Sequence, residues 1–212
     1  MAIQKTGKTK KRVTPTLRHS ITLRAAVEIL KQGGVILFPT ETAYGFAADA
    51  RRAQAVEKIF ALKGREAGKT PPLIVASAAM AAEYMELTPV LAKLAKKYWP
   101  GPLTIVGNVR KGLASNVVRS DGTVAVRVSS LASARALSRG LGAPIVATSA
   151  NRAGEPTCYS VEACLAQLKA AEVVHLPDAI MDVGRLAEIP ASTIVTEKNG
   201  KIVVLRQGSI TI

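Results

Sequence analysis

Three basic residues lie close together in the sequence, just after a segment with helical periodicity, and together they could bind a polyanion. Lys63, Arg65 and Lys69 are interleaved with Gly64 and Gly68, which predicts a loop that can adapt to an anion. An arginine can bind a phosphate through two parallel hydrogen bonds, whereas a lysine acts as a point charge. From these residues alone, a solvated basic helix end is the commoner meaning of such charges.

A polar turn follows the first predicted strand. Residues 35–38 are consecutive apolar residues, two of them β-branched, and are typical of a buried strand that Pro39 ends. Open α/β sheets place ligands just past the carboxyl ends of their strands. The side chains that follow this strand are therefore candidates for ligand binding: Thr40, Glu41, Thr42 and Tyr44.

Ser149 and Asn151 occupy the equivalent place after a second predicted strand, residues 144–147. Both residue types suit a helix cap or an Asx turn. Both could equally donate hydrogen bonds to phosphate and ribose at the end of a strand. The residues alone leave the two interpretations open.

Arg127 is a charged residue in a predicted strand, residues 123–128, whose other members are mostly apolar. A charge in such a place must be paired or face a cleft, because burying it alone is costly. The alternatives are an edge-strand salt bridge and a bidentate contact with a ligand carboxylate.

The sequence lacks the residues that several kinds of binding and catalysis require. No P-loop and no GxGxxG after a strand occur, so any nucleotide must be held by side chains and strand-end amides. His19 and His175 lack the setting of a Ser/His/Asp hydrolase, and nothing indicates a covalent nucleophile. Cys158 and Cys164 have no partner cluster and are expected to be unpaired thiols in a reducing compartment.

Hydrophobic periodicity predicts a chain of alternating strands and helices. Helices are expected at 21–32, 51–62, 78–86, 89–98, 131–139 (ended by Gly140) and 161–170, and strands at 35–38, 73–76, 103–109, 123–128, 144–147, 173–176, 192–196 and 202–206. The residues between the last two strands, 198–200, are a hairpin signal. We therefore expect one α/β domain with a twisted, open, mixed sheet covered by helices.

Composition and charge limit the possible partners. The 212 residues are 48% hydrophobic, enough for one domain with a sizeable core, and no apolar run approaches the length of a membrane helix. The net charge is +14, and half of it comes from residues 1–24, which contain seven Lys or Arg and no acid. We expect residues 1–18 to be a flexible basic tail, for loose nucleic-acid contact or merely for solubility, ahead of a domain at 19–212. The basic excess of the domain favours a polyanionic partner such as a nucleotide, pyrophosphate or RNA.

Seven short words of the sequence, in order, resemble the YrdC-like family, whose enzymes make threonylcarbamoyl-AMP. They are PTETAYG at 39–45, IFALKGR at 59–65, WPGPLTIV at 99–106, VAVRV at 124–128, TSANRAG at 148–154, STIV at 192–195 and LRQGSI at 205–210. The resemblance implies the YrdC-like fold, with a concave, basic face. The sequence departs from the family pattern at two positions. Residue 66 is a Glu where Pro is common, and residue 76 is an Ala where many members have His.

The resemblance also implies roles for individual residues. Lys63 and Arg65 would bind the ATP phosphates and stabilise the displacement, and Arg127 would hold the carboxylate of L-threonine. The other implied contacts with ATP are Lys69, Thr123, Ser149, Asn151, Thr157 and Arg206, and those with threonine are Thr40, Thr42, Tyr44 and Ser192.

The activity that the resemblance implies joins L-threonine, bicarbonate or CO2, and ATP into threonylcarbamoyl-AMP and pyrophosphate. Mg²⁺ would be carried with ATP, and no protein metal site is expected. The product would serve tRNA modification by separate threonylcarbamoyl-transfer proteins in the cytoplasm, with no membrane involved. The length resembles that of stand-alone synthases. The alternative is a YrdC-like module that binds tRNA or double-stranded RNA without synthase activity.

Overall fold

The structure, a computed structural model, describes residues 20–64, 70–110 and 112–212. The predicted basic tail, residues 1–18, lies outside the described residues, as do two of the predicted anion-binding residues, Arg65 and Lys69. Among the described residues, no helix combines the length and the apolar composition that crossing a bilayer requires.

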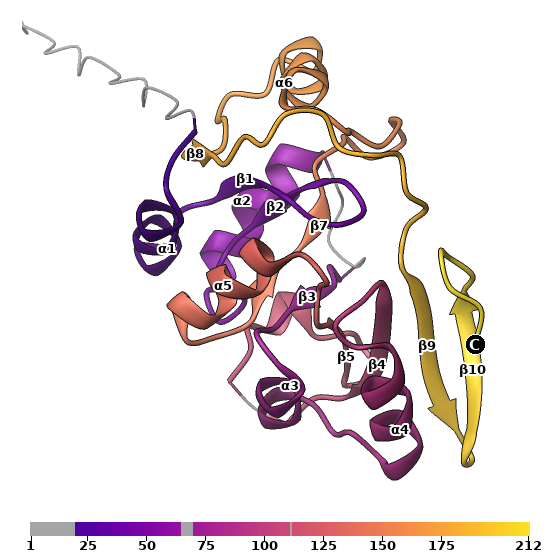
Figure 1. The fold of residues 1–212 in the computed structure, drawn as a ribbon. Helices are drawn as coiled ribbons and strands as arrows, with labels where there is room; N and C mark the ends of the chain where they lie inside the picture. Colours follow the sequence, from indigo (N-terminus) through magenta and orange to yellow (C-terminus); the bar gives the residue numbers. More distant parts are fainter. Residues whose placement is uncertain (1–19, 65–69, 111) are drawn as a thin grey trace, which may run out of the picture.

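The described strands form two open sheets of mixed direction (Figure 1). The small sheet has the order β7-β2-β1-β8, with β1 at Ile36–Pro39, β2 at Tyr44–Ala47, β7 at Thr148–Ser149 and β8 at Ala179–Ile180. The large sheet has the order β10-β9-β4-β5-β3-β6, with β3 at Leu73–Ile74, β4 at Leu103–Asn108, β5 at Thr123–Arg127, β6 at Ile145–Val146, β9 at Thr193–Lys198 and β10 at Lys201–Arg206.

The two sheets meet where the chain leaves one and enters the other. β6 belongs to the large sheet and β7 to the small sheet, and only Ala147 separates them. Beside this crossing, the Val146 amide donates a hydrogen bond to the Ala48 carbonyl over 2.8 Å. The predicted open, mixed sheet is thus confirmed in character, and the structure resolves it into two sheets that share this junction.

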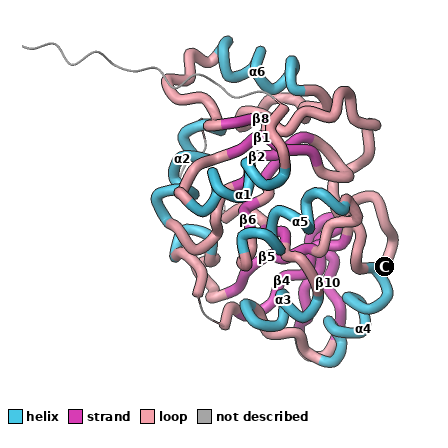
Figure 2. Tube along the Cα trace, turned by 60° about the vertical axis from the view of Figure 1, so that its left-hand side comes forward, coloured by secondary structure: helices cyan, strands magenta, loops and turns pink. Residues whose placement is uncertain are grey.

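Six α-helices and one short 3-10 helix, Ser115–Val117, lie in the described part of the chain (Figure 2). Several begin where the sequence offers a side-chain cap, because a Ser or Thr oxygen accepts a hydrogen bond from an amide of the first turn. Thr22, Ser77, Thr88 and Ser160 do this. The helices are α1 at Leu23–Lys31, α2 at Ala53–Lys63, α3 at Ala78–Tyr84, α4 at Pro89–Tyr98, α5 at Ala132–Leu141 and α6 at Val161–Ala170.

The core is divided between the helices. Met85, which follows α3, and Leu91 of α4 pack onto β4, where a Cβ at Gly107 would lie 2.6 Å from the terminal carbon of Met85 and 3.7 Å from a methyl of Leu91. One cluster of buried side chains joins α1 and α5 to β1, β6 and β8, and a larger cluster joins α2, α4 and α6 to both sheets. Figure 1 shows α3 and α4 at one end of the molecule and α6 at the other.

The predicted end of helix α5 at Gly140 is wrong. The helix continues to Leu141, and Gly142, with φ of 71°, is the residue that ends it in the left-handed conformation. Gly140 serves the packing of two helices, because a Cβ there would lie only 2.7 Å from a methyl group of Val27 on α1. Gly140 thus allows α5 to pack closely against α1. The periodicity of the α5 sequence alone does not show which helix packs against it.

The predicted strand at 173–176 is also wrong. These residues form no strand, and the strand of this region is β8, which pairs in parallel with β1. Val174 is 74% exposed and Leu176 47% exposed, so their apolar character does not mark a buried strand. The predicted hairpin is confirmed: β9 and β10 pair antiparallel, and Asn199 and Gly200 at the turn both have positive φ.

Candidate active site

One face of the large sheet carries several of the predicted site residues. In β5, Val124 and Val126 are fully buried, and Thr123, Ala125 and Arg127 alternate with them on the opposite face. Thr123 and Arg127 therefore share a face. They lie four positions apart along the strand, about 13 Å. A ligand of the size of an amino acid at Arg127 therefore cannot also reach Thr123.

The structure brings most of the predicted threonine-binding residues into one small pocket. Its volume is about 40 Å³, and it lies between the turn after β1, the start of β2, the end of β5 and the β6–β7 junction. Its lining consists of Thr40, Thr42, Ala43, Tyr44, Gly45, Arg127, Ala147, Thr148 and Ser149. Ser149, expected from the resemblance to contact ATP, thus lies beside four residues expected to contact threonine.

Thr40 shapes the turn that forms one wall of this pocket. Its hydroxyl donates to the Ala43 carbonyl over 2.7 Å and accepts hydrogen bonds from the amides of Thr42 and Ala43, each over 3.2 Å. The Thr42 hydroxyl lies 3.1 Å from the Thr40 hydroxyl. The Thr40 hydroxyl uses its proton within the turn, so it is not available as a donor to a ligand. Its contacts with the amide and the hydroxyl of Thr42 hold Thr42 in position.

The glycine of the PTETAYG word allows two strands to approach. β2 pairs antiparallel with β7, and Gly45 stands opposite Ser149. A Cβ at Gly45 would lie 2.9 Å from the Thr148 carbonyl oxygen, closer than real side chains come to a backbone. Residue 45 must therefore be glycine if the Ser149 wall is to stand this near the Thr40 turn.

Tyr44 places its ring in the pocket lining and its hydroxyl elsewhere. The hydroxyl lies 2.8 Å from the Gly184 carbonyl and 3.1 Å from an Asp182 carboxylate oxygen, its two possible acceptors, and it accepts the Val183 amide over 3.0 Å. Burial raises the pKa of Tyr44 to about 12, the Val183 hydrogen bond opposes this rise, and Asp182 adds to it. The hydroxyl anchors residues 182–184, so only the ring is left to shape the pocket.

Arg127 is buried against a carboxylate of the chain itself. Its Nη1 lies 3.1 Å from Oε1 of Glu41, and the two side chains are 8% and 12% exposed. The other oxygen of Glu41 accepts a hydrogen bond from the Ser129 hydroxyl. Burial lowers the pKa of Arg127 and the charge of Glu41 raises it, as expected when an ion pair offsets the loss of water. The pair spans the strand end and the turn, so it is not the edge-strand salt bridge that the sequence offered as an alternative.

Ser192 and Arg206 form a second group on the same face of the large sheet. The Arg206 guanidinium donates to the Ser192 carbonyl over 2.7 and 3.1 Å and to the Ser192 hydroxyl over 3.1 Å. The Ser192 hydroxyl also lies 2.8 Å from that of Thr104 on β4. Only β4 separates β9 from β5 in the sheet, and the positive charge of Arg206 adds to the effect of burial in lowering the pKa of Arg127.

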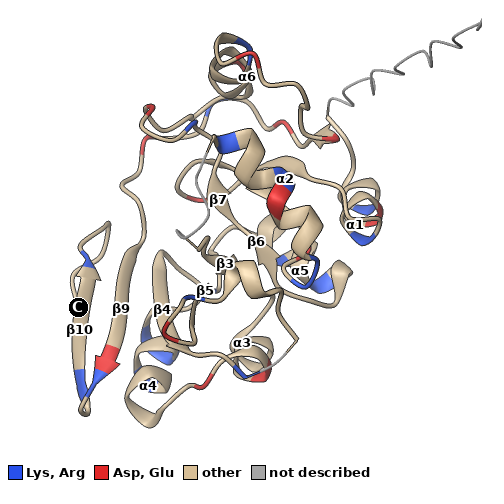
Figure 3. Cartoon of the chain, turned by 180° about the vertical axis from the view of Figure 1, so that it is seen from behind, with Lys and Arg blue, Asp and Glu red and all other residues tan. Residues whose placement is uncertain are grey.

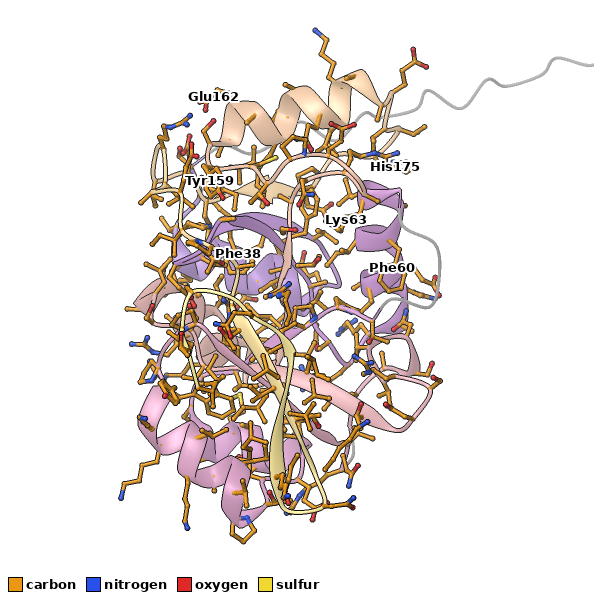
Figure 4. All side chains as sticks on the ribbon, turned by 90° about the vertical axis from the view of Figure 1, so that its right-hand side faces the viewer. Phe38, Phe60, Lys63, Tyr159, Glu162 and His175 are labelled. Carbon is orange, nitrogen blue, oxygen red and sulfur yellow. The ribbon has the colours of Figure 1, made fainter. Side chains whose placement is uncertain are left out.

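Lys63 connects α2 to the segment that carries Ser149 and Asn151. Its ammonium donates hydrogen bonds of 2.5 and 2.6 Å to the carbonyl oxygens of these two residues, and its side chain is buried. The Asn151 side chain donates to the carbonyls of Arg152 and Glu155, and its Oδ1 is buried with no hydrogen bond among the described residues. Figure 4 shows Lys63 inside the molecule, between α2 and the region below α6.

Two predicted contacts lie further from the pocket. Thr123 donates to Asp121 over 2.6 Å and lines a separate cavity of about 330 Å³ at the far end of β5. Thr157 is exposed, next to Cys158, whose carbonyl accepts the Tyr44 amide over 3.1 Å. The view from behind shows basic residues on many elements, including α1, the end of α2 and both ends of β10 (Figure 3). Positive charge is therefore not confined to the pocket.

The sequence placed Glu41 among the candidate ligand-binding residues but did not pair it with Arg127, and it gave no role to Ser129 or Asp182. Glu41 was visible as an acid among threonines, and a buried arginine requires a partner, so this pair could have been suspected. Ser129 and Asp182 gave no such signal, because their contacts with Glu41 and Tyr44 are 88 and 138 residues away in sequence. Cys158 and Cys164 are buried free thiols, as expected.

Comparisons with known proteins show the family of the chain and agree with its fold. The Sua5/YciO/YrdC family model, described as "Telomere recombination", matches residues 28–208. Two curated proteins named threonylcarbamoyl-AMP synthase are similar: the one from Thiobacillus denitrificans is 37% identical over 64% of this chain and 72% of its own length, and the one from Idiomarina loihiensis is 38% identical over 63% and 73%.

A solved structure of Sua5 from P. abyssi, complexed with L-threonine, superposes with a TM-score of 0.80 at 30% identity. The match covers 91% of this chain and 57% of the P. abyssi chain, so this chain spans less than two thirds of the length of that protein. The family model covers most of the described residues, including the pocket and the Lys63 contacts. The chain therefore belongs to the Sua5/YciO/YrdC family.

Proposed function

We propose that this chain is a threonylcarbamoyl-AMP synthase, an enzyme that joins L-threonine, bicarbonate or CO2, and ATP with release of pyrophosphate. Relatives with this name are 37 and 38% identical, and a relative of known structure binds L-threonine. In this reaction the threonine amine takes up CO2, and the resulting carbamate attacks the α-phosphorus of ATP. The enzyme is thus a transferase, of the nucleotidyltransferase kind.

The observation that carries the proposal is the pocket that joins a buried guanidinium to threonine hydroxyls. Arg127 supplies a cation at a place with almost no access to water, and Thr42 and Ser149 line the same pocket. A guanidinium suits a carboxylate, and hydroxyls suit the hydroxyl of threonine. These groups support an amino acid with a short polar side chain as the ligand.

The ATP side of the site is proposed to lie beyond Ser149. We propose that the nucleotide contacts the Asn151 Oδ1, the Arg206 guanidinium and Thr123, since each offers a group of a kind that nucleotides bind. Catalysis by such a site is positioning and charge neutralisation, because the carbamate needs only to be held in line with the α-phosphorus. Arg65 and Lys69, which are outside the described residues, would add their positive charges to the binding of the phosphates.

Mg²⁺ is proposed to arrive on the ATP phosphates, since it keeps several waters and binds phosphates readily. Within the described residues, no group of three or more His, Cys, Asp or Glu could hold a metal ion. The product is proposed to pass to separate proteins that transfer the threonylcarbamoyl group to tRNA, in the cytoplasm.

The test is an assay of pyrophosphate release. With ATP and Mg²⁺ present, release should require both L-threonine and bicarbonate, and L-serine should be a much poorer substrate because it lacks the methyl group. Equal turnover with L-alanine, or none with L-threonine, would contradict the proposal.

A further inference from the structure

Glu41 stands between Thr40 and Thr42, which line the pocket; its side chain is 12% exposed, and its two oxygens have different surroundings. Oε2 accepts the Ser129 hydroxyl. Oε1 lies 3.1 Å from Arg127 Nη1, but the N–H does not point at it, so Oε1 is buried with no hydrogen bond among the described residues. It therefore has capacity for a donor that the chain does not supply.

The ion pair sets a condition on the charge of any ligand. Glu41 and Arg127 neutralise each other, and both are shielded from water. A ligand with a carboxylate alone would place two carboxylates on one guanidinium and leave an excess negative charge in a buried place, which is costly. Arg206 lies on the same face of the large sheet as Arg127, but its guanidinium already binds Ser192.

A ligand with both charges avoids this cost. If its carboxylate binds Arg127 while a positive group binds Glu41, each buried charge keeps a partner and the sum of charges stays the same. An α-amino acid carries an ammonium and a carboxylate on one carbon, so its two charges are about as close as those of the pair.

We propose that Glu41 and Arg127 together recognise the zwitterionic head group of the amino acid substrate. Arg127 takes its carboxylate, and Oε1 of Glu41 accepts a hydrogen bond from its ammonium while Ser129 holds Oε2. Glu41 is thereby the residue that selects an α-amino acid over a carboxylic acid of the same shape. This inference rests on the proposed function and identifies Glu41 as the residue that recognises the amino group of the substrate.

The first test uses the unmodified protein and two ligands. (R)-3-hydroxybutyrate has the hydroxyl, methyl and carboxylate of L-threonine but no amine. Calorimetric titration should give an affinity for L-threonine at least ten-fold higher, the loss expected for one charge-assisted hydrogen bond. Equal affinities for the two ligands, or no binding of either, would overturn the inference without any variant.

The second test replaces the acid. Glu41→Gln should weaken L-threonine binding ten- to hundred-fold and leave (R)-3-hydroxybutyrate binding unchanged or tighter, because Arg127 no longer has a carboxylate to exchange. Glu41→Asp keeps the charge and should retain more of the selectivity. Glu162→Gln, at an exposed acid of α6 (Figure 4), is the control and should change neither ligand.

The outcomes separate the inference from the function on which it rests. If Glu41→Gln weakened both ligands by the same factor, Glu41 would be a structural partner of Arg127 only and the inference would be wrong. If the unmodified protein bound L-threonine selectively but released no pyrophosphate, the proposed function would fail while the recognition of the zwitterion stood.

Discussion

The guanidinium of Arg127 is stabilised in the protein interior by the carboxylate of Glu41. Its side chain is 8% exposed, and Glu41 lies 3.1 Å away on the turn after β1. Removing one partner of a buried pair leaves the other charge without compensation, which usually costs more than the pair contributes. Substitutions at this site therefore need a measure of stability beside the measure of binding.

Arg127→Ala should mainly raise the threonine requirement. A charge-assisted contact of about 1.5–3 kcal/mol corresponds to roughly a ten- to hundred-fold weaker affinity. Arg127→Lys should restore only part of it, because an ammonium cannot bind two oxygens in parallel. Titration of each variant with threonine and with ATP checks this, and Arg185→Ala, at an exposed arginine, is the control. Weaker ATP binding with unchanged threonine binding would contradict the assignment of the pocket.

Tyr44→Phe should change the dependence of stability on pH. The folded protein raises the pKa of Tyr44 to about 12 from a usual 10.0, so the neutral hydroxyl is favoured on folding. The stability that this contributes is complete below pH 10 and is lost as the pH rises toward 12, by up to about 1.4 kcal/mol per pH unit. Denaturant unfolding of both proteins between pH 9 and 12 should show the wild type losing its advantage over the variant. Parallel curves would count against a hydroxyl buried in this way.

Among the elements, the crossing of α1 and α5 is defined by a residue without a side chain. A Cβ at Gly140 would lie 2.7 Å from a methyl of Val27, and Gly140 lies inside α5. Helix propensity favours Ala over Gly by about 0.5–1 kcal/mol, whereas overpacking costs about 1–3 kcal/mol. The steric clash should therefore outweigh the gain in helix propensity, and a substitution of Gly140 by Ala should lower the stability of the protein.

Gly140→Ala should accordingly destabilise the protein by about 1 kcal/mol. In the Val27→Ala background, the same substitution should be neutral or stabilising, since the methyl group that it meets is gone. A double-mutant cycle by thermal or denaturant unfolding measures this coupling. A stabilising Gly140→Ala in the wild type would mean that the helices separate easily.

The sequence predicts elements well where one short pattern decides them, and less well where distant residues do. The hairpin at Asn199 and Gly200 and the helix α6 follow from local signals and were placed correctly. The segment 173–176 is apolar but exposed, and nothing local distinguishes it from a strand. In the pocket, Arg127 could be singled out from its strand, but its pairing with Glu41 brings together residues that lie 86 positions apart, so only the folded chain shows it.

At the scale of the whole molecule, the basic charge is divided between a tail and a domain. Residues 1–18 contain six Lys or Arg and no acid. Their deletion should leave pyrophosphate release intact and lower any RNA affinity together with its salt dependence, because fewer counterions are released on binding. Steady-state assays and titrations with tRNA at two salt concentrations check both effects. Loss of synthase activity on deletion would mean that the tail takes part in the reaction.

The ammonium of Lys63 acts, through the peptide groups whose carbonyls it binds, on hydrogen bonds made by other residues. The carbonyls that it binds, of Ser149 and Asn151, belong to peptide groups whose amides are those of Ala150 and Arg152. The Ala150 amide donates to the Tyr44 carbonyl over 2.9 Å, and the Arg152 amide to the Gln167 side chain over 3.0 Å. A cation on one side of a peptide group polarises it and strengthens the hydrogen bond on the other side. One buried charge at the end of α2 thus reinforces the attachment of β7 to β2 and of α6 to the turn that precedes it.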